Sequence, residues 1–314
     1  MKPRLPVETG VAVILLAASA WLAITFPTFR SGATSYVIIG NASEIAILAA
    51  GMTLVIAAGG IDVSVGSVLG LCAIVLGKLA GEMGWSIWPA CGASIGVGVA
   101  CGLITGTLVA RFAVPPIVAT LAMFAAARAG AYVLSGGDSI SQLPEGLISL
   151  GYGSLFGMPY TAWVAAGVFV LGGLVVRRTS FGRGVLAIGG GRTAAFLSGQ
   201  PTQRIETWVY GINGLLAGLA AVIVVARGAT AIPDAGRFSE MTAITAVVLG
   251  GTPVTGGQCT MTGTTLGVLA IGVITNGVRA YGKGDIWVLL VLGCALLVAV
   301  EVDRWRRRER RRTE

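Results

Sequence analysis

The sequence predicts an all-α, polytopic transmembrane bundle of about ten helices, some of them short or broken. Hydrophobic residues fill 55% of the 314 positions and charged residues only 11%, with a mean hydropathy of +0.85, far from the averages of soluble domains. The 48 glycines suit helices that associate in lipid through small residues. Few residues are aromatic, which disfavours a barrel of strands with aromatic girdles.

The expected spans follow from apolar runs that glycine, proline and charge interrupt. A hydrocarbon core about 30 Å thick takes roughly 20 apolar residues per helix, so the run at 241–251 is too short to cross alone and predicts a half-helix or part of a broken span. The first run resembles a signal peptide, but its length suffices to span, and we expect an uncleaved helix. The spans are 10–27, 41–59, 63–80, 87–110, 114–135, 160–176, 207–226, 241–251, 263–280 and 285–302.

The basic residues predict the orientation. Most of the 22 lysines and arginines fall on one side if both termini are cytoplasmic. We therefore predict a cytoplasmic segment at 1–9, a single transmembrane domain at 10–302 and a basic cytoplasmic tail at 303–314. Seven arginines in this tail directly follow an apolar run, which favours anchoring to anionic membrane lipid over nucleic-acid binding.

Residue types that carry catalysis are scarce. Histidine is absent, which removes the commonest general base and metal ligand. The five cysteines form no CxxC pair, and no GxxxxGK[ST] loop is present. We predict no catalytic residue, no metal site and no cofactor bound by this chain.

Glycine spacing suggests close packing and an internal echo. Several glycine pairs have i, i+4 spacing, including 92 with 96, 98 with 102, and 263 with 267, which is typical of helix packing in lipid. The stretches 53–71 and 246–268 both read as an apolar run, a glycine pair, a polar turn and two spaced glycines. Duplicated, glycine-interrupted segments often mark a transport pathway.

The segment 177–206 is the longest polar stretch on the predicted inner side. Within it, 193–198 can form a short amphipathic helix that Thr193 starts and that Gly199 and Pro201 stop. One interpretation is a loop held to lipid by its arginines. The other is a helix that fits a groove on a partner protein.

A resemblance favours the second interpretation. The segment FGRGVLAIGGGRTAAFLSGQPTQRI resembles the ATPase-docking loop of the monosaccharide (ribose and xylose type) branch of bacterial ABC importer permeases. Three further blocks resemble the same family in the same order: GGIDVSVGSVLGL at 59–71, PPIVATLAMFAAARAGAYVLSGG at 115–137 and AITAVVLGGTPVTGGQ at 243–258. The first and last look especially like an autoinducer-2 import permease. The sequence departs from the family at 258–260, where glycine and serine are usual.

The resemblance implies a multi-pass inner-membrane transport subunit, not an enzyme, for a small sugar or sugar-like solute. It also implies three partners: a cytoplasmic ABC ATPase that binds the ATP, a second permease chain, identical or related, and an extracytoplasmic solute-binding protein. We expect Ala195 to face the groove of the ATPase. The residues of the docking (coupling) helix are then Gly191, Arg192, Thr193, Ala194, Ala195, Ser198 and Gly199.

Polar side chains inside spans are candidates for a translocation path or gate, because charge is costly in lipid. Asp62 can instead cap a helix at the inner boundary, and Glu44 can interact with a helix dipole in the first turn of its span. Arg128 lies deeper and must pair or face a wet cavity. An ion-coupled secondary transporter is the alternative function, and it has only these three charged candidates. The candidate path residues are Asn41, Glu44, Asp62, Ser64, Arg128, Asn213 and Asn276.

Overall fold

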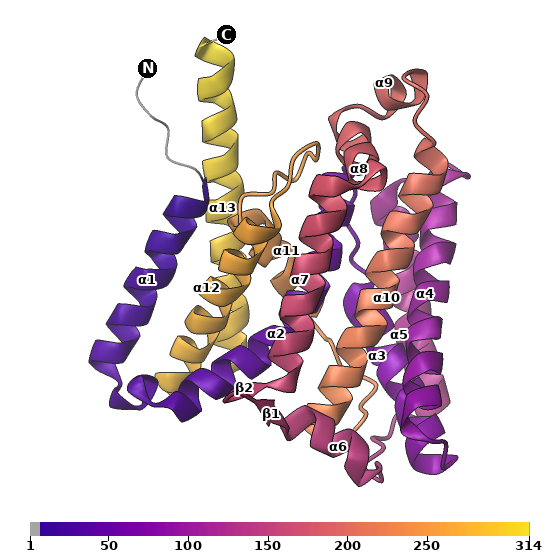
Figure 1. The fold of residues 1–314 in the computed structure, drawn as a ribbon, viewed down its shortest axis with the longest axis vertical. Coiled ribbons are helices and arrows are strands. Elements are labelled where there is room, and N and C mark those ends of the chain that lie inside the picture. Colours follow the sequence, from indigo (N-terminus) through magenta and orange to yellow (C-terminus); the bar gives the residue numbers. More distant parts are fainter. Residues whose placement is uncertain (1–6, 314) are drawn as a thin grey trace.

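The computed structural model describes residues 7–313, with side chains described for 8–284 and 286–301. Most of the segment predicted at 1–9, with its two basic residues, lies outside the described residues, as do the side chains of the tail arginines. The described chain is a helical bundle, and every predicted span coincides with a helix (Figure 1). Its elements are α1 (Val7–Thr25), η1 (Pro27–Arg30), α2 (Gly32–Ala57), α3 (Val65–Gly77), η2 (Lys78–Glu82), α4 (Ile87–Ala110), α5 (Pro116–Ser135), α6 (Glu145–Tyr152), β1 (Ser154–Leu155), β2 (Met158–Pro159), α7 (Tyr160–Arg178), α8 (Ser180–Gly190), α9 (Arg192–Leu197), α10 (Thr202–Gly228), α11 (Ser239–Leu249), α12 (Met261–Ala280) and α13 (Asp285–Thr313).

Eight helices of the described chain are long and apolar enough to cross a membrane, and α11 and the apolar part of α13 are shorter. The predicted half-helix at 241–251 is confirmed as α11. The second span begins at Gly32 rather than 41, because Ser31 caps it by accepting a hydrogen bond from the Thr34 N–H. Helices α6 and α8 were not predicted, since both lie in polar segments.

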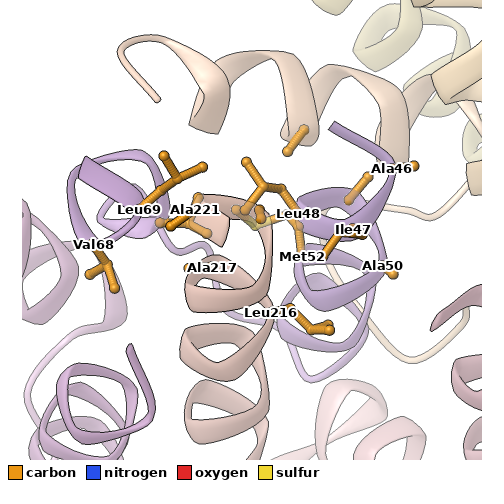
Figure 2. Packing of buried hydrophobic residues seen from close by; sticks show 14 of the residues in the cluster. Ala46, Ile47, Leu48, Ala50, Met52, Val68, Leu69, Leu216, Ala217 and Ala221 are labelled. Atoms are coloured by element: carbon orange, nitrogen blue, oxygen red, sulfur yellow. The ribbon is translucent and has the colours of Figure 1, made fainter. Parts of the chain in front are cut away.

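The two longest buried helices, α2 and α10, form the centre of the bundle. They run antiparallel, because Gly40 packs against Arg227 at one end and Gly51 against Asn213 further along. Figure 2 shows the apolar packing there, with Ile47 and Met52 of α2 near Leu216 of α10. Close packing of these side chains stabilises the core through van der Waals contacts, because lipid tails are as apolar as the side chains themselves.

Glycine allows α4 to approach α10 backbone to backbone. A Cβ at Gly98 or Gly214 would overlap the carbonyl oxygen of the other residue. These glycines therefore pack helices as predicted. Gly92 and Gly96 do not, since open space surrounds both within this chain.

Two short helices begin inside the bundle. Helix α2 is followed by the link 58–64 and then α3, and α10 is followed by the link 229–238 and then α11. Their first turns meet, since a Cβ at Gly66 of α3 would overlap the Glu240 carboxylate of α11 and the Gly236 carbonyl. The corresponding pairs are thus α2–α3 and α10–α11. The stretch 53–71 contains the end of α2 and the start of α3, and its counterpart is therefore the end of α10 and the start of α11. The predicted correspondence with 246–268 is wrong, because that stretch contains the end of α11 and the start of α12.

The bundle has two distinct ends (Figure 1). Helices α8 and α9 lie at one end, together with the start of α1 and the end of α13. We call this the α9 end. The strands β1 and β2 and helix α6 lie at the opposite end, where Ser154 pairs with Pro159 and Leu155 with Met158.

Candidate functional site

Helix α9 projects from its end of the bundle (Figure 1). The predicted short helix is confirmed, and the positive φ of 80° at Gly199 ends it. Gly191, rather than Thr193, precedes its first turn. The expected orientation of Ala195 is wrong, because this side chain is 4% exposed and faces its own chain. The exposed apolar residues are Phe196 and Leu197, at 66% and 78%, and they form the candidate partner surface.

An ion pair holds α9 to the membrane helices. Arg192 donates from Nε and Nη2 to the two carboxylate oxygens of Glu206, at 2.7 and 2.9 Å, and Nη2 also donates to the Ala110 carbonyl at 3.1 Å. The hydrogen bond to Glu206 raises the pKa of Arg192. One side chain therefore joins α9 to α10 and to the end of α4. Glu206 was missed from the sequence because its partner lies fourteen residues away across a turn.

The four sequence blocks converge beside this ion pair. A cavity of about 400 Å³ is lined by Gly60 from the first block, Pro115 from the second, Gly189 from the docking loop and Thr255 from the last. Gly189 has no room for a Cβ, because the Ala57 carbonyl and the Gly257 N–H meet there. The link 58–64 and the turn at Thr255 are thus packed beside the Arg192 end of α9.

One face of α10 leads from this cavity into the bundle. Glu206, Tyr210 and Asn213 are spaced i, i+4 and i+7, which places them on the same side of the helix. Glu206 binds Arg192, the buried Tyr210 hydroxyl packs against Gly60, and the Asn213 amide donates to Asp62 at 2.8 Å. We call these three residues the α10 face.

The Asp62 carboxylate is buried and fully bonded. One oxygen accepts from the Ser64 N–H at 2.8 Å and the Ser64 hydroxyl at 2.6 Å, and the other accepts from Asn213. Asn213 lies about 16 Å along α10 from its start, so Asp62 is inside the bundle rather than at the predicted boundary. The N-cap position of α3 is Ser64, not Asp62. The structure thus brings together three candidate residues: Asp62, Ser64 and Asn213.

A second group of candidates lies toward the opposite end. Asn41, Glu44 and Asn276 line one cavity of about 340 Å³ between α2, α11, α12 and α13. Glu44 is inside α2, not in its first turn, and accepts a hydrogen bond from Ser239 at 3.2 Å. Arg227 donates to Asn41 at 2.7 Å. Neither of these two partners was predicted, because each lies far away in the sequence.

Arg128 stands apart from both groups. Its Nη1 donates to the carbonyls of Pro233 and Ala235, at 2.6 and 3.2 Å, and lies 3.9 Å from the Asp234 carboxylate. The approach requires Gly70, where a Cβ would lie 2.9 Å from this nitrogen. The predicted need for a partner is met by backbone carbonyls of the 229–238 link.

The turn at 258–260 has a local explanation. Thr260 caps α12 by accepting from the Gly263 N–H, and its hydroxyl donates to Glu8 of α1 at 2.7 Å. Threonine here therefore joins α1 to α12. Among the side chains of residues 8–284 and 286–301, the structure contains no group of three histidine, cysteine or acidic residues that could hold a metal ion.

Comparison with known proteins decides the family. A family model described as "Branched-chain amino acid transport system / permease component" matches residues 36–300. The chain belongs to this permease family. Together with the eight membrane-length helices, this makes it a multi-pass inner-membrane transport subunit of ABC type, not an enzyme.

Similar proteins indicate which branch of the permease family this chain resembles. The permease is 33% identical to the L-arabinose ABC transporter permease protein AraH of Azospirillum brasilense, over 97% of this chain and 89% of the relative. It is 36% identical to the ribose import permease protein RbsC of Escherichia coli K12, over 94% and 93%. It is 32% identical to the fructose import permease protein FrcC of Rhizobium meliloti, over 96% and 86%. No solved structure matches the permease.

These relatives confirm the resemblance to the monosaccharide branch. They give no support to the closer resemblance to an autoinducer-2 permease. Family membership also favours import powered by ATP over the ion-coupled alternative.

Proposed function

We propose that this permease forms the translocation path for a small sugar or sugar-like solute, which an extracytoplasmic binding protein delivers and a separate ABC ATPase drives across the membrane. The relatives import ribose, arabinose and fructose by name, and a monosaccharide is the solute class that fits them all. A second permease chain, identical or related, completes the path.

The observation that carries the proposal is the exposed α9, pinned to the bundle by Arg192. The exposed side chains of Phe196 and Leu197 form a small apolar surface that a groove on a soluble ATPase would cover. Because Arg192 and Glu206 hold α9 to α10, a displacement of the docked ATPase would be transmitted to the membrane helices.

The proposal also orients the chain. The segment that contains α8 and α9 is basic, as is typical of short loops on the cytoplasmic side. Its arginines include Arg183 within α8 and, on either side, Arg177, Arg178 and Arg204. The α9 end is then cytoplasmic, with both termini. The strands β1 and β2 face the binding protein.

The test is ATP hydrolysis in proteoliposomes that contain the permease and its candidate ATPase. Binding proteins loaded with ribose, arabinose, fructose or autoinducer-2 are added in turn. Stimulation by one loaded binding protein supports the proposal and identifies the solute. No stimulation and no complex with any candidate ATPase would contradict it.

Docking has its own test. Replacing Leu197 with Glu should abolish copurification of the ATPase, because a charge would enter the apolar contact. The matched control is Leu155→Glu in β1, an exposed leucine at the opposite end. Equal copurification in both variants would count against α9 as the docking helix.

A further inference from the structure

A cavity of about 390 Å³ lies between α5 and the segment that joins α10 to α11. Its walls include Arg128 and Tyr132 from α5, Asp234, Arg237 and Phe238 from the link, and Glu240 from α11. We call it the α5 cavity. Its size is within the range of small-molecule sites in proteins.

The charges around the α5 cavity balance. Two arginines and two carboxylates face it, and Asp234 lies 3.9 Å from Arg128 and 4.0 Å from Arg237. A charged solute would meet as many like charges as opposite ones. A neutral solute with many hydroxyl groups can donate to the carboxylates and accept from the guanidinium groups, so the balance favours a neutral polyol.

One wall of the cavity is strained. Phe238 has φ 65° and ψ 4°, a left-handed conformation that is unfavourable for a bulky residue. Its ring is half-exposed, and the Arg237 guanidinium lies 5.1 Å from the ring centroid. Such strain concentrates at ligand sites. Together with Tyr132, the ring offers an apolar surface for the C–H face of a sugar ring.

The cavity lies at a depth where lipid contact would be costly. Arg128 is seven residues from the end of α5, about 10 Å inside the helix. The side chains of Asp234 and Arg237, close beside it, are 44% and 64% exposed. Exposed charges at this depth face a water-filled path or another protein chain rather than lipid. Of these two surroundings, the water-filled path is the one that the proposed function supplies, and we take the α5 cavity to open toward it.

We propose that the α5 cavity is a binding site for a neutral monosaccharide on its way through the permease, with Phe238 and Tyr132 against the ring and the four charged groups at its hydroxyls. This inference rests on the proposed function, and it adds a solute site in the permease to the one in the binding protein.

The test uses the complete importer in proteoliposomes, with the binding protein and whichever of D-ribose, L-arabinose and D-fructose stimulates the unmodified complex. Phe238→Gly removes the ring and relieves the left-handed strain, so the chain should fold at least as well. Phe156→Gly is the matched control, since Phe156 also has a left-handed φ of 52° and is 88% exposed in the β1–β2 turn. Tyr132→Ala is a second variant, on the exposed side of α5.

The readout is radiolabelled sugar accumulated per ATP hydrolysed. We expect this ratio to fall at least tenfold in Phe238→Gly and Tyr132→Ala, with ATP hydrolysis still stimulated, and to stay unchanged in Phe156→Gly. An unchanged ratio in the two cavity variants would overturn the proposal, whether uptake and hydrolysis both stay at their normal rates or both fall in equal proportion. If only autoinducer-2 stimulates the unmodified complex, the α5 cavity proposal fails while the proposed function stands, and if no solute stimulates it, both fail.

Discussion

The links 58–64 and 229–238 occupy corresponding places and have opposite character. Each follows a long central helix and precedes a short one, and the first turns of the two short helices touch. In the first link, the Asp62 carboxylate is buried and accepts three hydrogen bonds. In the second, Phe238 is strained and Arg237 is largely exposed. We call the first link, with its hydrogen-bonded Asp62, the closed junction. We call the second link, whose residues Arg237 and Phe238 line the α5 cavity, the open wall.

The difference arises from what the neighbouring helix presents to each link. Gly51 leaves room for Asn213 of α10, whose amide completes the bonding of Asp62. Glu240 has no such neighbour, and among the described residues its Oε2 has no hydrogen-bond partner, which is also true of the Asn213 Oδ1 beside Asp62. The difference therefore lies in the two carboxylates: both oxygens of Asp62 are hydrogen-bonded, and bonding of this kind rigidifies a junction.

The largest effect should come from breaking the closed junction. Asp62→Ala leaves the buried Asn213 amide and the Ser64 N–H without an acceptor, and each unsatisfied group costs roughly 1–3 kcal/mol. We expect the free energy of unfolding to fall by about 3 kcal/mol, measured by thermal unfolding of the purified permease in detergent.

Asp138→Ala is the matched control for Asp62→Ala, because Asp138 lies exposed in the loop after α5. It should unfold at the same temperature as the unmodified chain. If both variants unfold alike, the bonds of Asp62 do not hold the junction.

A smaller loss is expected where the two short helices touch. Gly66→Ala would push a Cβ into the Glu240 carboxylate and the Gly236 carbonyl, and such overpacking costs roughly 1–3 kcal/mol. Gly92→Ala, in open space on α4, should be neutral or stabilise the chain by up to about 1 kcal/mol. Thermal unfolding compares the two, and equal midpoints would mean that the helices can separate freely.

The spans could be predicted from the sequence, but most of the contacts that distinguish the two links could not. Apolar periodicity and length predicted the spans, including the half-helix α11, because each span needs its own apolar run. The contacts of Asp62 with Asn213 and of Arg128 with Pro233 join residues more than a hundred positions apart. No local pattern contains them.

The residues of the α5 cavity were missed for a further reason. Arg128 was a candidate because charge inside a span is conspicuous. Nothing in the sequence distinguishes Asp234, Arg237 and Phe238 from ordinary loop residues. They lie inside the bundle because the 229–238 link folds back against Arg128, which binds two of its carbonyls. Ala195 was misplaced similarly, since a helix of six residues has too little periodicity to reveal which side is buried.

Arg128→Lys probes how the open wall is held in place. Both contacts come from Nη1, and the lysine nitrogen lies one bond nearer to the backbone, so we expect Arg128→Lys to lose one of the two carbonyl contacts and about 1.5 kcal/mol of stability. Arg237→Lys is the control, because this side chain is mostly exposed and should shift the unfolding midpoint little. The expectation is contradicted if Arg128→Lys unfolds like the control, since the link would then be held by other contacts.

The smallest expected effect concerns the coupling between α9 and the membrane helices. If a movement of α9 reaches α10 through the Arg192–Glu206 ion pair, Arg192→Glu should weaken stimulation of ATP hydrolysis by the loaded binding protein about fivefold, which corresponds to about 1 kcal/mol. This is modest because Arg192 is half-exposed. Adding Glu206→Arg restores the ion pair with reversed charges and should recover most of the stimulation. It cannot restore all of it, because a glutamate at 192 cannot donate to the Ala110 carbonyl.

The control for this pair is Arg183→Glu, an exposed arginine of α8 for which no ion pair with Glu206 is seen. It changes the charge of the docking loop equally but should leave stimulation intact. A double variant no better than Arg192→Glu would show that charge at position 192 acts on the ATPase directly. Recovery in the double variant would instead assign the coupling to the ion pair between α9 and α10.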